Sequence, residues 1–496
     1  MIKQIIIYIL LFFSLLSYGQ EELAHFKVSM KKSAPLTKDI VPIVNKTTGN
    51  ISFSLISSKS IFNYLFNDHF KIIDSLQMEN KSIKYKSIIG HSINSENECR
   101  IYLTSDFEDK FSIVNFSYKK DTSYIKDFEL NFKDEVFVQA FPYNQHLYIL
   151  SIIKKSSIIN VYELNKDGTI DKKSVDFSKT TFLNYKNKET TLYELLLPNN
   201  SALKGGPIIS NSKKIADVVK IDTKILNPID ITAGLSKLYL YKNKVLLTLD
   251  QNEQLTQLIS INLNTFQKGV FQIKKPFYEI EKNKKKTNSF ICNDKIFMIA
   301  TTKDKFTFMV KNLLNQNKIV EYSASETDSI NFKNSPIIQV GGYYDTYQEF
   351  EKTKKFLRKI YDGDDGMSVY KTKNTYEILL GGKAEYKASG GGMGLGGPSI
   401  STTSFGAVTV YYNPTLFAYN QYAHTKSTFV KGFFDKDFKH IEGNIPTNAY
   451  DKIKSIKEDK EISPNAKTVF KYKDFYILGN YFLWPRQEYV LYKFED

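Results

Sequence analysis

The chain has 496 residues, of which 42% are hydrophobic and 14% aromatic, so there is enough apolar mass for a sizeable packed core. Only 13 prolines accompany 36 phenylalanines and 33 tyrosines, which excludes collagen-like and long disordered chains and favours β-strands. The formal net charge is +15, but Arg100, Arg358 and Arg486 are the only arginines and the lysines are interspersed with acidic residues. Because phosphate and base recognition relies on arginine, this pattern argues against a nucleic-acid partner.

The chain begins with the pattern of a secretory signal peptide. Lys3 precedes an apolar run over residues 5–16, and small residues at Ser17 and Gly19 come before an acidic pair. About 12 apolar residues are too few to span a bilayer, which takes about 20. We therefore predict a signal peptide over residues 1–19, with an uncleaved anchor as the alternative. The mature chain is predicted to be exported, periplasmic or extracellular, with no transmembrane segment after signal cleavage.

Short strand-like runs recur along the rest of the chain. They occupy residues 51–56, 101–104, 147–153, 192–197, 245–249, 296–301, 376–380 and 475–478. The first six begin 45 to 53 residues apart, in units of three or four runs separated by polar turns. A period near 50 residues with several strands per unit is typical of β-propellers, in which thin sheets bury one another's faces. We predict an all-β chain, a β-propeller of six to eight blades, with seven as the best estimate.

The same period sets the predicted domain organisation. An N-terminal extension over residues 20–50 precedes blades over residues 51–340, and residues 407–496 hold the remaining blades. Strand-like runs continue almost to Asp496, which predicts that the ring closes by pairing strands from both ends of the chain.

Residues 341–406 break the repeat and are predicted to form an insertion or lid with a helix and a glycine-rich loop. Thr346 and Glu349 have the spacing of a capping box, which predicts a helix that begins there. A strand over residues 376–380 and a glycine-rich segment over residues 381–397 follow. Long irregular segments of this kind are often functional.

Tyrosines crowd this irregular region, and exposed tyrosine supplies rigid, amphipathic contact area for glycans or proteins. We name Tyr343, Tyr344, Tyr386 and Arg358 as candidate binding residues; the alternative for the tyrosines is that they fill the core. The predicted function is that of an exported binding or interaction protein of the cell envelope. Its partner is predicted to be a protein, a glycan or another envelope component.

Catalytic and metal motifs do not emerge from the sequence. The six histidines show no metal-ligand spacing, and the glycine-rich segment is followed by proline instead of the Lys-Ser/Thr of a phosphate loop. No cofactor, metal or catalytic residue is therefore predicted. The alternative function is a secreted glycosidase-like hydrolase with carboxylates at the central channel, for which Asp106, Glu108 and Asp250 are the candidates.

The two cysteines, Cys99 and Cys292, each lie just before an apolar strand-like run. If these runs belong to different blades, the thiols lie far apart. We predict two buried thiols, with a disulfide as the alternative for an exported chain.

Overall fold

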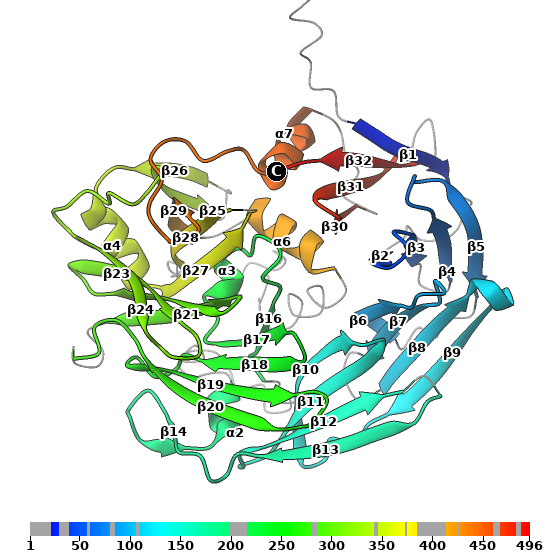
Figure 1. Cartoon of the computed structure of the whole chain (residues 1–496), viewed down its shortest axis with the longest axis horizontal. Helices are drawn as coiled ribbons and strands as arrows, with labels where there is room; N and C mark the ends of the chain where they lie inside the picture. Colours follow the sequence, from blue (N-terminus) through cyan, green and yellow to red (C-terminus); the bar gives the residue numbers. More distant parts are fainter. Residues whose placement is uncertain are drawn as a thin grey trace, which may run out of the picture. The chain divides into compact units, whose positions relative to one another are not determined.

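The computed structural model describes residues 21–28, 39–56, 60–79, 85–105, 110–165, 167–197, 216–279, 285–341, 346–372, 374–383, 413–423, 427–459, 467–482 and 488–496. The chain divides into two compact units, one of Met1–Ser75 with Thr447–Asp496 and the other of Leu76–Pro446. Among the described residues, seven sheets of four or five strands and one of two strands make up nearly all the regular structure (Figure 1). The chain is an all-β protein with a β-propeller fold, and seven sheets agree with the predicted blade number.

The first unit holds two four-stranded sheets. One has the order β2-β3-β4-β5 and the other β1-β32-β31-β30. Their strands are β1 (Glu21–Lys27), β2 (Asp39–Val44), β3 (Ile51–Ile56), β4 (Ile61–Phe66), β5 (Ile72–Met78), β30 (Thr468–Tyr472), β31 (Phe475–Phe482) and β32 (Glu488–Phe494). Strands from both ends of the chain pair as predicted, because β1 pairs antiparallel with β32. The predicted N-terminal extension thus contributes β1 and β2 to two sheets.

Aromatic side chains pack these two sheets against each other. The Phe26 ring of β1 lies 6.1 Å from that of Phe53 on β3 and 5.6 Å from that of Tyr489 on β32, measured between centroids. All three side chains are buried in one apolar cluster. A two-sheet core of this kind explains the aromatic enrichment of the sequence, because each large ring buries roughly 150–250 Å².

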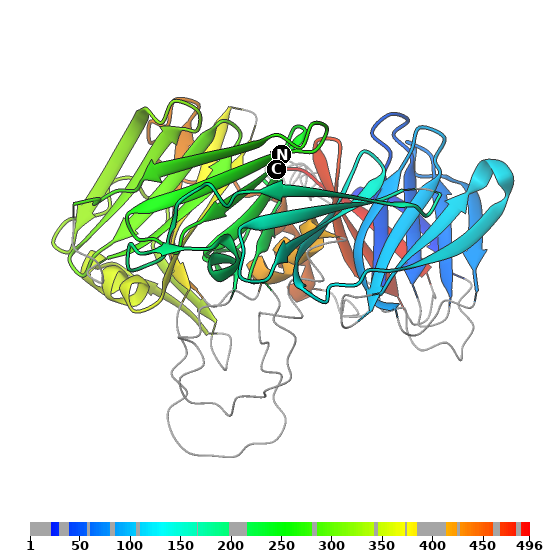
Figure 2. The same ribbon diagram turned by 90° about the horizontal axis from the view of Figure 1, so that it is seen from below.

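The second unit holds the other five large sheets, which follow one another in an arc (Figures 1 and 2). Their strands are β6 (Tyr85–Ile93), β7 (Cys99–Ser105), β8 (Lys110–Ser117), β9 (Thr122–Glu129), β10 (Glu135–Tyr143), β11 (His146–Ile153), β12 (Ile158–Leu164), β13 (Ile170–Asp176), β16 (Val219–Ile221), β17 (Ser236–Tyr241), β18 (Lys244–Leu249), β19 (Leu255–Asn262), β20 (Lys268–Lys274), β21 (Lys286–Cys292), β22 (Lys295–Thr301), β23 (Lys305–Asn312), β24 (Lys318–Ser325), β25 (Ile337–Gly341), β26 (Thr346–Phe350), β27 (Asp364–Lys371), β28 (Thr375–Lys383) and β29 (Ser427–Asp435). The small sheet pairs β14 (Phe182–Leu183) with β15 (Glu189–Thr190).

The described helices are few and short. They are the 3-10 turn η1 (Tyr118–Lys120) and the α-helices α2 (Leu192–Leu196), α3 (Ile229–Thr232), α4 (Thr353–Tyr361), α6 (Pro414–Ala423) and α7 (Ala449–Asp459). In the described part of the chain, none of them has the length and apolar character needed to cross a bilayer.

Seven of the eight predicted strand runs each fall in a different large sheet. They correspond to β3, β7, β11, β18, β22, β28 and β31. Each is an inner strand of its sheet with both faces covered, as in β22, where six of seven residues are buried. A strand buried on both faces reads as a continuous apolar run, which made these strands visible in the sequence.

The remaining run, over residues 192–197, was wrongly predicted to be a strand. Residues Leu192–Leu196 form helix α2 instead of a strand, and Leu192, Tyr193, Leu195 and Leu196 are buried. The Thr191 side chain caps the helix by accepting a hydrogen bond from the Glu194 backbone N–H at 3.2 Å. Thr191 and Glu194 have the spacing of a capping box, and leucine favours helix over strand, so the correct signal was present.

The strands of the irregular region belong to one five-stranded sheet, which has the order β26-β25-β29-β28-β27. The helix start predicted from the capping box at Thr346 was wrong. Residues Thr346–Phe350 form strand β26, and helix α4 begins at Thr353. The reason is that β26 pairs along its whole length with β25, so its backbone hydrogen bonds go to a neighbouring strand. The predicted strand over residues 376–380 is confirmed as part of β28. Residues 384–397 of the glycine-rich segment lie outside the described residues.

Gly382 on β28 is required by close packing. A Cβ atom there would lie 2.8 Å from the Asp364 carbonyl oxygen and 3.2 Å from the Ile360 Cβ. Because Ile360 belongs to α4, the absence of a side chain lets the helix approach the sheet.

Both cysteines are buried and neither forms a disulfide. Burial raises the pKa of the Cys292 thiol to about 12. Since only the thiolate attacks disulfide reagents, we expect the native protein to react with Ellman's reagent far more slowly than the urea-unfolded protein. Unfolding without reductant should release both thiols. Rapid reaction of the native protein, or fewer thiols than cysteines after unfolding, would contradict this.

Candidate functional site

The structure describes one of the four predicted binding residues. Tyr343, Tyr344 and Tyr386 lie outside the described residues, whereas Arg358 lies on α4 with its side chain exposed. Of the other tyrosines in the region, Tyr370 and Tyr376 are buried and Tyr347 is 58% exposed. Of these, the strand tyrosines Tyr370 and Tyr376 thus fill the core, as the alternative for the tyrosines has it.

Helix α4 is amphipathic, and this fixes where Arg358 points. Phe356, Leu357 and Ile360 are fully buried in the core shared with the neighbouring sheet. The Phe356 ring lies 5.4 Å from that of Phe306 on β23, measured between centroids. At the start of the helix, the Thr353 hydroxyl donates a hydrogen bond to the Asp328 carbonyl oxygen at 2.5 Å. With one face held in this way, the opposite face presents its cations to the solvent.

A pocket of about 400 Å³ lies along the exposed face of α4. We call it the α4 pocket. It is lined by Lys303, Glu326, Lys352, Lys354, Lys355, Arg358, Tyr361 and Asp362. Lys303 comes from the turn between β22 and β23, and Glu326 follows β24, so the neighbouring sheet supplies one wall. The volume is within the usual range for small-molecule sites, roughly 300–1,000 Å³.

The α4 pocket is strongly positive. Five cations face two carboxylates, and α4 itself contains no acidic residue in its first turn. One carboxylate is already paired, because Glu326 lies 3.0 Å from the Lys354 ammonium. The Lys303 ammonium lies 5.9 Å from the centre of the Tyr361 ring. The Arg358 guanidinium has no ion-pair or hydrogen-bond partner among the described residues.

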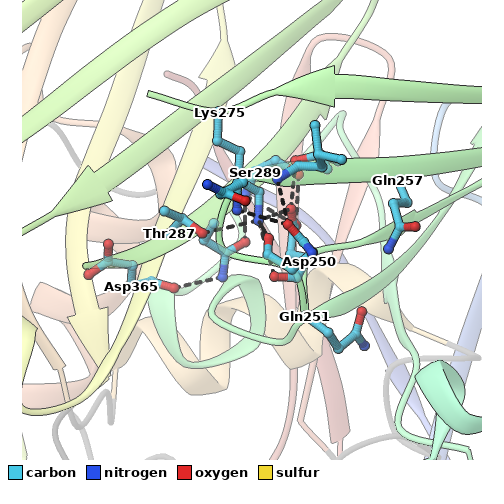
Figure 3. A network of polar contacts seen from close by, with 12 residues as sticks. Asp250, Gln251, Gln257, Lys275, Thr287, Ser289 and Asp365 are labelled. Atoms are coloured by element: carbon cyan, nitrogen blue, oxygen red, sulfur yellow. Dashed lines mark hydrogen bonds and ion pairs between the residues drawn. The ribbon is translucent and has the colours of Figure 1, made fainter. Parts of the chain in front are cut away.

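A second polar cluster lies inside the second unit, between the sheet of β16 to β20 and strand β21 of the next sheet (Figure 3). The Asp250 carboxylate lies 3.1 Å from the Lys237 ammonium and 3.0 Å from the Lys275 ammonium, and all three side chains are fully buried. Its oxygens also accept hydrogen bonds from the Ser289 hydroxyl and the Thr256 hydroxyl, each at 2.7 Å. We call these five residues the Asp250 cluster. Although burial opposes ionisation, the two lysines and the hydroxyls hold the pKa of Asp250 well below its usual range.

The two lysines of this cluster were not predicted from the sequence. Lys237 and Tyr239 are two residues apart on β17, so both lie on the same face of the sheet. Tyr239 belongs to the apolar core. A lysine two positions from a core residue on the same strand was the signal in the sequence that this lysine is buried. Its partners at Asp250 and Lys275 come from other parts of the blade, and no local pattern links the three.

Asp365 on β27 lies beside this cluster (Figure 3). Its backbone carbonyl oxygen accepts a hydrogen bond from the Asn288 amide at 2.6 Å. The side chain is buried, and neither carboxyl oxygen has a hydrogen-bond partner among the described residues. Burial raises the pKa of Asp365 to about 7, although the positive charges of Lys286 and Lys275 oppose this rise.

Of the three carboxylate candidates for hydrolysis, the structure describes only Asp250. Asp106 and Glu108 lie outside the described residues. Asp250 is inaccessible to a substrate, and its lowered pKa is unsuited to a general acid, which must hold a proton at working pH. Among the described residues, no group of three or more His, Cys, Asp and Glu side chains is placed to hold a metal ion.

Comparison with known proteins identifies no family. No family model and no curated protein matches the chain. Among solved structures it is similar to an ACO/RPE65 chimera, with a TM-score of 0.28 and 8% identity over 61% of this chain and 64% of that one. It is also similar to the Dos1 propeller, with a TM-score of 0.28 and 9% identity over 73% of this chain and 84% of that one.

A third similarity is to the WD40 domain of SCAP from fission yeast, with a TM-score of 0.28, 10% identity, and coverage of 95% of this chain and 98% of that one. The chain spans just under two thirds of the chimera's length. Similarities this low assign no ligand and no activity to the chain.

Proposed function

We propose that this chain is an exported β-propeller that binds a component of the cell envelope through the α4 pocket. The observation that carries the proposal is the pocket itself. Arg358, one of the predicted binding residues, lies in a hollow of ligand size whose walls come from helix α4 and from turns of the neighbouring sheet. The guanidinium is exposed and has no partner among the described residues, so it is free to contact a ligand.

Export is proposed from the signal-peptide pattern at residues 1–19, which precede the first described strand. A positively charged chain outside the cytoplasm meets anionic envelope polymers, and a net charge of +15 attracts them over long distances. A binding role also agrees with the inaccessibility of Asp250, which removes one of the three carboxylate candidates for the hydrolase alternative.

The test uses the chain from Gln20 onward and separate fractions of the source cell's envelope: polysaccharide, lipid and protein. We expect saturable binding to one fraction. We expect a triple variant, Lys352→Ala with Lys355→Ala and Arg358→Ala, to lose it. The matched control is Lys173→Ala, which removes an exposed lysine from β13. Absence of saturable binding to every fraction would refute the proposed function, and binding that the triple variant retains would refute the site.

A further inference from the structure

We infer that the α4 pocket is a site for an anionic sugar, in which Arg358 and the pocket lysines bind a sugar carboxylate and Asp362 accepts a hydrogen bond from a sugar hydroxyl. This inference rests on the proposed function, because it names the ligand class of the same site. The ligand unit is a uronic acid residue within an acidic polysaccharide.

The positive charges on helix α4 favour a bound anion, and a role in stabilising the helix does not explain them. Helix α4 carries Lys354, Lys355, Arg358 and Lys359 and has no acidic residue between its first and last positions. Lys354 and Arg358 are four residues apart, as are Lys355 and Lys359, and like charges at this spacing destabilise a helix. Glu326 compensates only Lys354. A bound anion relieves the remaining repulsion.

The two carboxylates in the pocket distinguish a sugar from a polyphosphate. Asp362 is exposed, and its carboxylate has no partner among the described residues. A carboxylate accepts hydrogen bonds and donates none when ionised, so it matches the hydroxyls of a sugar ring. Nucleic acid and polyphosphate present rows of acceptor oxygens, which Asp362 and Glu326 would repel. A sugar acid combines an anionic group with hydroxyl donors, and the pocket combines cations with an acceptor.

The pocket wall from the neighbouring sheet provides a second residue with which to test the site, independent of helix α4. Lys303 lies in the turn between β22 and β23, far before Arg358 in the sequence, yet lines the same hollow. Its ammonium lies over the Tyr361 ring, which keeps it at the rim. A ligand bound within the pocket contacts both Lys303 and Arg358, whereas a ligand bound only on the helix surface contacts Arg358 alone.

The experiment measures trigalacturonate binding to the chain from Gln20 onward by calorimetry, with neutral galactotriose and inorganic polyphosphate as comparison probes. We expect trigalacturonate to bind. Arg358→Ala should weaken it at least about tenfold, Lys303→Ala at least about threefold, and Lys173→Ala not at all. Binding should weaken as salt is added. Circular dichroism and the melting temperature confirm that each variant folds, which the exposure of these side chains predicts.

Three results would overturn the inference: galactotriose binding as tightly as trigalacturonate, polyphosphate binding more tightly, or Arg358→Ala or Lys303→Ala binding like the unaltered chain. The proposed function survives such a result if envelope binding is saturable and lost in the triple variant. It fails independently if no envelope fraction binds, whatever trigalacturonate does.

Discussion

Replacing Asp250 with asparagine is expected to lower the free energy of unfolding by about 3–5 kcal/mol, because two lysine ammonium groups then remain buried without a counter-charge. An asparagine side chain has nearly the same shape and still accepts hydrogen bonds, so the variant tests the charge and not the packing. Burial already lowers the pKa of Lys237 and of Lys275, and Asp250 opposes that shift for both. Removing the carboxylate lowers both lysine pKa values further.

The measurement is urea unfolding at neutral pH, in which a shift of the midpoint at constant slope reports the change in stability. Glu279→Gln, in an exposed turn of the same unit, is the matched control and should leave the midpoint unchanged. Lys237→Met should cost less than Asp250→Asn, because Asp250 then keeps Lys275 and the hydroxyls of Ser289 and Thr256. A loss below about 1 kcal/mol for Asp250→Asn would show that the cluster does not carry this charge balance.

The same variant should respond to pH in a defined direction. In Asp250→Asn the folded pKa values of the two lysines lie further below their unfolded value, so the unfolded state binds more protons between the two values. Stability therefore rises with pH as the buried ammonium groups deprotonate, and the deficit of the variant shrinks in alkaline solution. Unfolding curves across the alkaline range check this; a deficit that stays constant would contradict it.

The sheet framework was predictable because strands buried on both faces form continuous apolar runs. The runs at 51–56 and 475–478, for example, are now β3 and β31 of two sheets in one unit. The outer strands were harder to see, as in β9, where most residues are exposed. The capping-box motif was ambiguous, since Thr191 begins a helix whereas Thr346 begins a strand. Pairing with the preceding strand β25 decided the outcome at Thr346, and the four residues of the capping-box motif contain no record of that pairing.

The candidate site was predictable only in part. Arg358 could be named because arginine is scarce and this one lies in the irregular region. Its neighbours Lys303 and Glu326 precede it by tens of residues and reach the same pocket only because helix α4 packs against their sheet. The Asp250 cluster likewise gathers residues from several strands. Such sites depend on tertiary contacts, and a sequence this rich in lysine gives no means of choosing among its many cations.

Asp365 is expected to make stability fall as pH rises through the weakly acidic range. Its pKa is about 7 in the folded chain, whereas the ordinary value for an aspartate is 3.8. The folded state therefore binds the proton more tightly than the unfolded state. The stabilisation is fully present below the unfolded pKa and is lost as pH rises to the folded pKa. A difference of roughly three pKa units corresponds to about 4 kcal/mol.

Asp365→Asn isolates this contribution, because asparagine stays neutral at every pH and resembles the protonated acid in shape. Relative to this variant, the unaltered chain should lose up to about 4 kcal/mol of stability between about pH 4 and about pH 8. Asp250 acts in the opposite direction, since its lowered pKa makes stability fall as acid is added. The difference between the two chains removes that shared effect and the effect of all other carboxylates.

The comparison is made by urea unfolding of both chains at a series of pH values, with Glu279→Gln as the control whose profile should parallel the unaltered chain. A difference between the unaltered chain and Asp365→Asn that does not change with pH would contradict the prediction. Such a result would mean that the ionised carboxylate gains counter-charge on deprotonation, and Lys286 and Lys275 are the cations whose charges already oppose the rise of its pKa. Combining Asp365→Asn with Asp250→Asn then tests that coupling directly, because freeing Lys275 from Asp250 would let it neutralise Asp365 and make the two substitutions non-additive.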